Sequence, residues 1–108
     1  MTVNVLGTEY EIVRSTYKED EGLTTCDGYC DDSVKRIVVS CEEKNNPDSK
    51  SDIPAVRRKQ LRHEIIHAFL SESGLAENSD WAQNEEIVDW IAIQGLKIYK
   101  AWEEAGAL

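Results

Sequence analysis

Two histidines, with a glutamate beside one of them, are the residues of this chain best suited to chemistry. They lie in His63-Glu64-Ile65-Ile66-His67, and the chain has no other histidine. Residues four apart lie on the same face of a helix, so both imidazoles can reach one metal ion. Glu64 then points beside the metal, where it accepts a proton from a metal-bound water whose pKa zinc lowers to about 7. The spacing predicts a zinc site with Glu64 as general base.

The segment Asn84-Glu85-Glu86-Ile87-Val88-Asp89 offers a third ligand. A glutamate from a neighbouring antiparallel helix completes a His₂Glu site and leaves one coordination position open for water. We expect Glu85 in this role because Asp89, four residues further on, shares its face and can accept the free ring N–H of a ligating histidine. Glu86 competes with Glu85 if the helix is rotated by about 100°. Glu86 shares its face with Trp90, which we interpret as a core residue.

The elements that position these residues form an α+β domain over residues 1–108. Four short runs rich in strand-forming residues, joined in pairs by turn residues, predict two hairpins and a small antiparallel sheet: 3–6 with 10–13, and 28–30 with 36–40. Residues 42–52 contain no apolar side chain and predict a solvated loop. The fold class is therefore a sheet followed by two helices, the active-site helix and the glutamate helix.

Both helices have recognisable ends. The first is capped by Ser51 or Asp52, has Pro54 in its first turn, and ends at Gly74 as its C′ residue. After a linker at 75–78, Asn78 or Ser79 caps the second helix, which ends near residue 106. We expect the second helix to bury a stripe of apolar residues at helical spacing, namely Ile87, Trp90, Ile91, Ile98 and Trp102.

The composition narrows the possible partners. The formal charge of -9 argues against nucleic acid, because phosphate binding depends on clustered Lys and Arg. The N-terminus does not resemble a signal peptide, and no stretch approaches the roughly 18 apolar residues that span a bilayer. Cys26, Cys30 and Cys41 cannot all pair within the chain, so we expect reduced thiols. The expectation is a cytoplasmic protein, without membrane association, whose partner is a protein or peptide.

Together, the two polar segments resemble the gluzincin metallopeptidases, whose pattern is HExxH on one helix and NExxxD on the next. The resemblance implies zinc at His63, His67 and Glu85, with Glu64 as general base and Asp89 orienting a histidine. It also implies that residues 36–40, the strand before the active-site helix, are the edge on which an extended peptide binds.

The small size, the order of sheet before helices, and the run HEIIHAFLSESGL are similar to the short ImmA/IrrE-like metallopeptidases of phages and mobile elements. In that group a helix-turn-helix repressor is fused to the enzyme or is its substrate, and no segment of this sequence resembles one. The resemblance therefore implies a minimal zincin-like fold that hydrolyses a peptide bond in a regulatory protein such as a transcriptional regulator. It does not indicate an oligomeric state.

Other interpretations of these residues remain open. Cys26 and Cys30 with the two histidines would form a closed Cys₂His₂ site, but structural zinc sites place their ligand pairs close together in sequence, and Glu64 would have no role. We expect the two cysteines to be buried, reduced side chains at a hairpin. A non-catalytic zinc-binding interaction module is a further alternative. Neither Tyr99 nor Arg62 can be assigned as oxyanion stabiliser.

Two groups of side chains are best explained by structure alone. The basic cluster on the first half of the active-site helix is expected to pair with local carboxylates on a solvated face. It consists of Arg57, Arg58, Lys59 and Arg62. The three tryptophans, Trp81, Trp90 and Trp102, are expected in core and rim packing.

Overall fold

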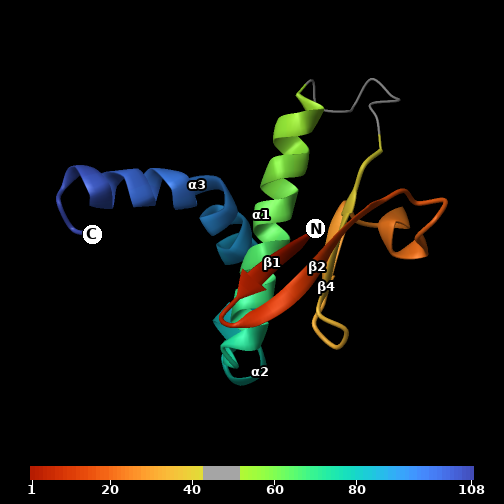
Figure 1. Ribbon diagram of the computed structural model, residues 1–108, viewed down its shortest axis with the longest axis horizontal. Coiled ribbons are helices and arrows are strands. Elements are labelled where there is room, and N and C mark those ends of the chain that lie inside the picture. The colour runs from red at the N-terminus through yellow and green to blue at the C-terminus, as the bar shows by residue number, and fades with distance from the viewer. Residues whose placement is uncertain (43–51) are drawn as a thin grey trace.

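The computed structural model describes residues 1–42 and 52–108 (Figure 1). Four strands and three α-helices occur in these residues, with two short 3₁₀ helices between them. The strands are β1 (Thr2–Val5), β2 (Thr8–Ser15), β3 (Gly28–Asp31) and β4 (Arg36–Ser40). The helices are α1 (Ile53–Glu72), α2 (Leu75–Asn78) and α3 (Glu85–Glu104), with η1 (Glu21–Thr24) and η2 (Asp80–Gln83). The α+β class is confirmed; most of the predicted loop at 42–52 lies outside the described residues.

The sheet has the strand order β1-β2-β4-β3 and is mixed rather than antiparallel. Both predicted hairpins form, because β1 pairs antiparallel with β2 and β3 pairs antiparallel with β4. The hairpins join through a parallel pair, in which Glu11 lies opposite Arg36 and Ser15 opposite Ser40. Parallel strands need a long crossover connection, here the segment that holds η1 and β3. The prediction of an antiparallel sheet was therefore wrong about one of its three pairings.

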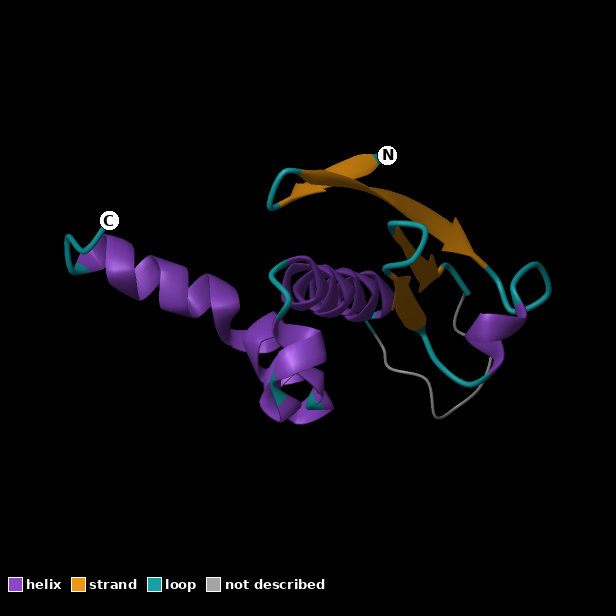
Figure 2. Cartoon of the chain, turned by 90° about the horizontal axis from the view of Figure 1, so that it is seen from below, coloured by secondary structure: helices purple, strands orange, loops and turns teal. Residues whose placement is uncertain are grey.

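The hydrophobic core lies between α1 and one face of the sheet, and Figure 2 shows α1 end-on within the curve of the strands. The fully buried residues of this core are Val5, Tyr10, Ile37, Val39 and Ala68. In β4 all residues after Arg36 are buried, which is typical of a strand with a neighbour on each side.

The C-terminal end of α1 is tied to the sheet by Glu72. Its carboxylate accepts hydrogen bonds from Thr8 Oγ1 at 3.1 Å and Tyr10 Oη at 2.8 Å, both on β2. Lys35 Nζ, in the turn between β3 and β4, lies 2.6 Å from the same carboxylate. The hydrogen bond from Lys35 is the largest cause of a lowered pKa at Glu72. One side chain thus connects both hairpins to the helix that carries the histidines.

The predicted ends of α1 are confirmed. The side chain of Asp52 accepts a hydrogen bond from the backbone N–H of Ala55, and Pro54 lies in the first turn. Ser51, the alternative cap, lies outside the described residues. Gly74 follows the helix with φ 83°, the left-handed conformation that glycine adopts at C′ without steric cost.

The N-terminus of α3 differs from the prediction. Residues 75–83 form α2 and η2, and Ser79 between them is extended, so neither Asn78 nor Ser79 caps α3. Asn84 does so instead, because its side chain accepts a hydrogen bond from the backbone N–H of Ile87. This cap places Glu85 in the first helical turn, where the helix dipole favours a carboxylate.

The predicted buried stripe on α3 was also wrong. Val88 and Ala92 are the buried residues of this helix. Of the predicted stripe, Ile87, Trp90 and Trp102 are exposed, and Ile91 and Ile98 are half-buried. Trp81 is exposed as well, so the three tryptophans do not pack in the core. Among residues 1–42 and 52–108, no helix combines the length and apolar character needed to cross a bilayer.

Candidate metal centre

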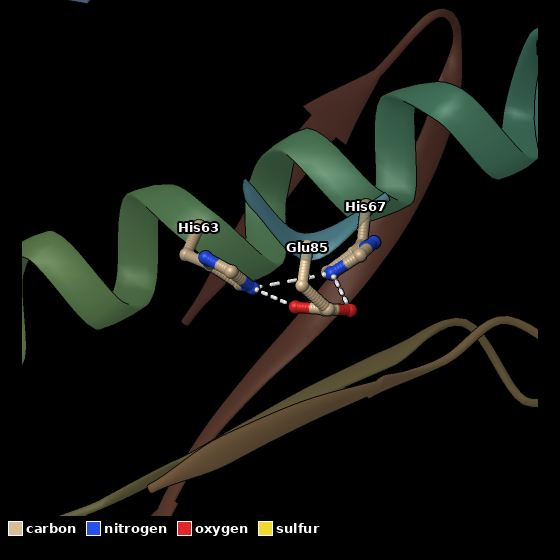
Figure 3. A group of neighbouring side chains, drawn as sticks. All are labelled: His63, His67 and Glu85. Atoms are coloured by element: carbon tan, nitrogen blue, oxygen red, sulfur yellow. Dashed lines mark hydrogen bonds and ion pairs between the residues drawn. The ribbon is translucent and has the colours of Figure 1, made fainter. Parts of the chain in front are cut away.

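The two histidines of α1 and Glu85 of α3 point toward one another (Figure 3). The Nε2 atoms of His63 and His67 are 3.2 Å apart. Glu85 brings one carboxylate oxygen to 2.8 Å from His63 Nε2 and the other to 3.0 Å from His67 Nε2. In the part of the chain that the structure describes, this is the one group of three His, Cys, Asp or Glu side chains whose donor atoms lie close enough to hold a metal ion.

The donor set fits a tetrahedral zinc ion. Zinc binds histidine nitrogen and carboxylate oxygen at about 2.0–2.2 Å, so two ligand atoms of a tetrahedral site lie roughly 3.3 Å apart. The two Nε2 atoms are 3.2 Å apart, close to that value, and each has a different carboxylate oxygen of Glu85 within 3.0 Å. The three side chains are therefore close enough together to hold one ion. Three protein ligands of the His₂Glu type also leave a fourth position open, as catalytic zinc sites do. The role of these residues as zinc ligands nevertheless stays a prediction.

Asp89 lies behind His63, one helical turn after Glu85. Its Oδ1 atom is 3.2 Å from His63 Nδ1 and 3.1 Å from Lys59 Nζ. Burial raises the pKa of Asp89, but hydrogen bonds from Lys59 and His63 outweigh this effect and leave the pKa lowered. An ionised Asp89 favours the tautomer with a proton on Nδ1, so Nε2 keeps its lone pair for a metal.

Glu64 is buried beside the two histidines, with 3 % of its surface exposed. Gln60 Nε2, one turn earlier on α1, donates a hydrogen bond to Glu64 Oε2. Burial raises the pKa of Glu64, and the nearby His63 and His67 oppose that shift. The two carboxylates near the histidines thus differ in their surroundings: Glu64 is buried and hydrogen-bonded to Gln60, whereas the side chain of Glu85 is 69 % exposed.

These side chains line a cavity of about 640 Å³. The helix α1 contributes Gln60, His63, Glu64, His67 and Ser71, and the second half of the chain contributes Ala76, Ala82, Gln83, Glu85 and Asp89. The opposite wall is β3 with the two residues before it, 26–30. The group of possible donors thus lies in a cavity between a helix and an edge strand.

The edge beside this cavity is β3, not residues 36–40 as the resemblance implied. Because β4 pairs with both β2 and β3, its backbone hydrogen-bonding groups are used on both sides. The strand β3 pairs with β4 alone, so its outer side is an open edge. The correction follows from the crossover that places β4 between β2 and β3.

The structure separates the competing candidates from the donor group. Glu86 is exposed and outside it, whereas Glu85 is inside. Cys26 and Cys30 line the cavity but do not join the donor group; Cys26 is exposed and Cys30 is half-buried, so the expectation that both are buried was wrong. All three thiols are free, and burial raises the pKa of Cys30 to about 12.

The two residues considered as oxyanion stabilisers lie outside the cavity lining. Arg62 Nε donates a hydrogen bond of 2.7 Å to the carbonyl oxygen of Ala92 and thereby connects α1 to α3. Tyr99 is exposed on the outer part of α3. Neither side chain is placed to act on a molecule bound in the cavity.

Part of the basic cluster forms the expected ion pairs. Arg57 lies 3.5 Å from Asp27, and Lys59 pairs with Asp89. Sequence reasoning missed that Lys59 and Gln60 contact residues of the site. A signal was present for Gln60, because it stands four residues before Glu64 and so shares its helix face. The contact of Lys59 with Asp89 depends on how α1 packs against α3 and had no such signal.

Comparison of the chain with protein-family models, with curated proteins and with solved structures finds no match. The site is therefore interpreted from its own geometry.

Proposed function

We propose that the chain is a zinc-dependent metallopeptidase. The observation that supports this best is the convergence of His63, His67 and Glu85, from two helices, with donor atoms close enough to hold one ion. Asp89 supports it further, because it approaches the ring nitrogen of His63 that faces away from the donor group. Glu64 supports hydrolysis rather than storage of a metal, because a closed structural site has no use for a buried carboxylate beside it.

Zinc at this site would lower the pKa of a water molecule to about 7 and polarise the scissile carbonyl. Glu64 acts as general base and takes the proton from the attacking water, then delivers it to the leaving amine. Gln60 holds the carboxylate of Glu64 in place through its hydrogen bond. Asp89 holds His63, and Lys59 neutralises Asp89.

The substrate is a peptide or an unfolded protein segment. The open edge of β3 forms one wall of the cavity, and an extended peptide can add to such an edge through main-chain hydrogen bonds. A peptide held there would place its backbone between β3 and the histidines of α1. A regulatory protein remains the substrate class that the resemblance suggests.

The test compares metal content and hydrolysis in four variants of the full chain: Glu64→Gln, Glu85→Ala, Glu86→Ala and Cys26→Ser. Glu64→Gln should keep one equivalent of zinc by mass spectrometry of the metal and lose at least about 10²-fold in cleavage of a labelled casein or a mixed peptide library. Glu85→Ala should lose the zinc. Glu86→Ala, which removes the neighbouring exposed carboxylate, should change neither quantity.

Two results would contradict the proposal in different ways. If Cys26→Ser removes the zinc and Glu85→Ala does not, the donor set is wrong and the site is not that of a hydrolase. If the wild-type chain binds zinc through His63, His67 and Glu85 but cleaves none of the library peptides, the non-catalytic zinc-binding module is the correct function.

A further inference from the structure

The end of the cavity beyond His67 is built from small or uncharged residues, and we call it the alanine end. Its wall comes from α1, α2 and η2, and it consists of Ser71, Ala76, Ala82 and Gln83. Ser71 lies one helical turn after His67, so the alanine end begins next to the donor group. The opposite end of the cavity, near the start of β3, is more polar and includes Asp27 and Gln60.

The direction of α3 explains why these residues lie beyond His67. Glu85 contacts both His67 and His63, whereas Asp89, one turn later, contacts His63 and Lys59. The first turns of α3 therefore run along α1 in the opposite direction. The residues that precede Glu85 lie toward the C-terminal end of α1, where Figure 1 also places α2.

Two alanines connect the alanine end to a hydrophobic cluster. Ala82 is 1 % exposed and forms the cluster with Leu70 and Val88. Ala76 packs against this cluster from α2, and the side chain of Gln83 donates a hydrogen bond to its carbonyl oxygen. An apolar side chain that enters here meets methyl groups backed by packed apolar residues. The whole cavity measures about 640 Å³, a size at which protein sites enclose much of a ligand.

The cavity lining disfavours an acidic guest. Asp27, Glu64, Glu85 and Asp89 all line it, and among the described residues no Lys or Arg side chain does. The alanine end itself offers two methyl groups, a hydroxyl and an amide. Burying a charge without a partner of opposite charge is costly, so a carboxylate has no favourable place at this end. The alanine end suits a side chain that is apolar and uncharged.

The orientation of β3 decides which part of a bound peptide reaches the alanine end. A Cβ atom at Gly28, where β3 begins, would lie 3.2 Å from the Cγ atom of Gln60. Lys35, in the turn after β3, contacts Glu72 at the end of α1. The strand therefore runs in the same direction as α1. A peptide that pairs antiparallel with the open edge of β3, the more stable pairing, runs the opposite way. Its residues before the scissile bond then lie at the alanine end.

We propose that the chain cleaves peptides after a large apolar residue, whose side chain occupies the alanine end. This inference rests on the proposed peptidase function and names its substrate class. Leucine, methionine and phenylalanine suit the position, because burial of their side chains removes the most apolar surface from water. Hydrolysis adds the oxygen of water to the carbonyl carbon of this residue and breaks the C–N bond to the next. The apolar residue becomes a new C-terminus, and the next residue leaves with a free amine.

The test has two readouts. In the first, the zinc-loaded wild-type chain digests a mixed peptide library, and mass spectrometry identifies the new C-termini. We expect leucine, methionine and phenylalanine there, enriched at least about tenfold over alanine and glutamate, the range of discrimination that an apolar pocket provides. In the second, Glu64→Gln binds fluorescent peptides without turnover. The peptides consist of glycine and serine with one variable residue, and fluorescence anisotropy should show the affinity order phenylalanine, alanine, glutamate.

Two leucine variants narrow the alanine end from different walls. Ala76→Leu adds volume from α2, and Ser71→Leu adds it from α1. Each should reduce the preference for phenylalanine over alanine to near one in both readouts. Ala101→Leu, at an exposed position of α3 outside the cavity, is the matched control and should keep the wild-type preference. Circular dichroism and zinc content are measured on every variant, to establish that the fold and the donor group are intact.

The outcomes separate this inference from the function on which it rests. A preference that survives both leucine variants, or cleavage without an apolar preference, overturns the inference and leaves the peptidase function intact. Enrichment of apolar residues at the new N-termini also overturns it, because the peptide then does not run antiparallel to β3. Binding in the expected order without any cleavage supports the alanine end as the apolar site and contradicts the peptidase function. If peptides are neither bound nor cleaved, both proposals are wrong.

Discussion

Asp89 Oδ1 lies 3.2 Å from His63 Nδ1, while the other ring nitrogen of His63 faces Glu85 at 2.8 Å. The two carboxylates are four residues apart on α3 and contact opposite sides of one imidazole ring. One helix face therefore supplies both a candidate ligand and the group that sets the orientation of another ligand. In the proposed zinc site, Asp89 is therefore the residue through which the metal affinity could be changed without removing a donor atom.

We expect Asp89→Asn to weaken zinc binding by about 10- to 100-fold, the usual cost of losing such a hydrogen-bonded partner of a metal ligand. An amide at position 89 accepts a weaker hydrogen bond from His63 and no longer favours one tautomer. Competition with a chromophoric chelator measures the affinity. Glu86→Gln, which removes a charge from the exposed neighbour, is the control and should leave the affinity unchanged. An equal loss in both variants would show that only net charge matters.

Cys30 should react slowly with alkylating reagents although it lines the cavity. Burial, and to a lesser degree the nearby Glu64, raise the pKa of this thiol to about 12, so the reactive thiolate is scarce near neutral pH. Cys26 and Cys41 are exposed. Limited iodoacetamide treatment at pH 8 followed by peptide mapping should label Cys26 and Cys41 before Cys30. Labelling of Cys30 at the same rate as the other two would contradict the packing of β3 against α1.

Local patterns were sufficient to predict most of the elements. The strands follow from β-branched runs between turn residues, and the ends of α1 follow from Asp52, Pro54 and Gly74. The parallel pairing of β2 with β4 was not predictable in this way, because it depends on the path of the crossover rather than on any residue in either strand. The burial of α3 failed for a related reason. The spacing of apolar residues such as Trp90 and Trp102 predicts a helix. It does not show whether another element covers these side chains, and the structure leaves them exposed.

The candidate site was easier to predict than the sheet. The spacing of four residues between His63 and His67, and again between Glu85 and Asp89, is a property of a single helix. The candidate site needs only one long-range contact, that of α1 with α3, to bring these four side chains together. The wall formed by β3 depends on the strand order, and so its role could not be read from the sequence.

The cluster around Glu72 predicts how stability depends on pH. The carboxylate has a lowered pKa in the folded chain, chiefly because Lys35 and Tyr10 donate hydrogen bonds to it. A lowered carboxyl pKa stabilises the fold above the unfolded value, near 4.5, and this stabilisation is lost as the pH falls through the folded value. We therefore expect Glu72→Gln to lower the urea midpoint at neutral pH and to reduce its fall below pH 4.5.

The measurement uses metal-free protein in EDTA, so that the loss of zinc in acid does not contribute. Glu77→Gln, at an exposed position on α2, is the control and should behave like the wild-type chain. If Glu72→Gln keeps the acid sensitivity of the wild-type chain, the stabilisation by Glu72 does not depend on its charge.

Gly28 should be the glycine of the described chain whose substitution affects the site most directly. A Cβ atom here would lie 2.9 Å from the carbonyl oxygen of Val38 and 3.2 Å from the Cγ atom of Gln60. Gly28→Ala must therefore shift β3 away from β4, move Gln60 away from Glu64, or both. Overpacking of this kind typically costs about 1–3 kcal/mol in the free energy of unfolding, which denaturant titration measures. If Gln60 is the group that moves, the proposed hydrolytic activity should fall as well, because Glu64 then loses its hydrogen bond from Gln60.

Gly95→Ala is the matched control, because a Cβ at Gly95 meets no atom within 4 Å. Alanine is favoured over glycine inside a helix, so this variant should be unchanged or stabilised by up to about 1 kcal/mol. The contrast between the two variants isolates the close approach of β3 to α1 from the general effect of a methyl group. Equal stability of Gly28→Ala and the wild-type chain would mean that β3 does not lie against Gln60, and the cavity would then lack the wall on which a peptide is proposed to bind.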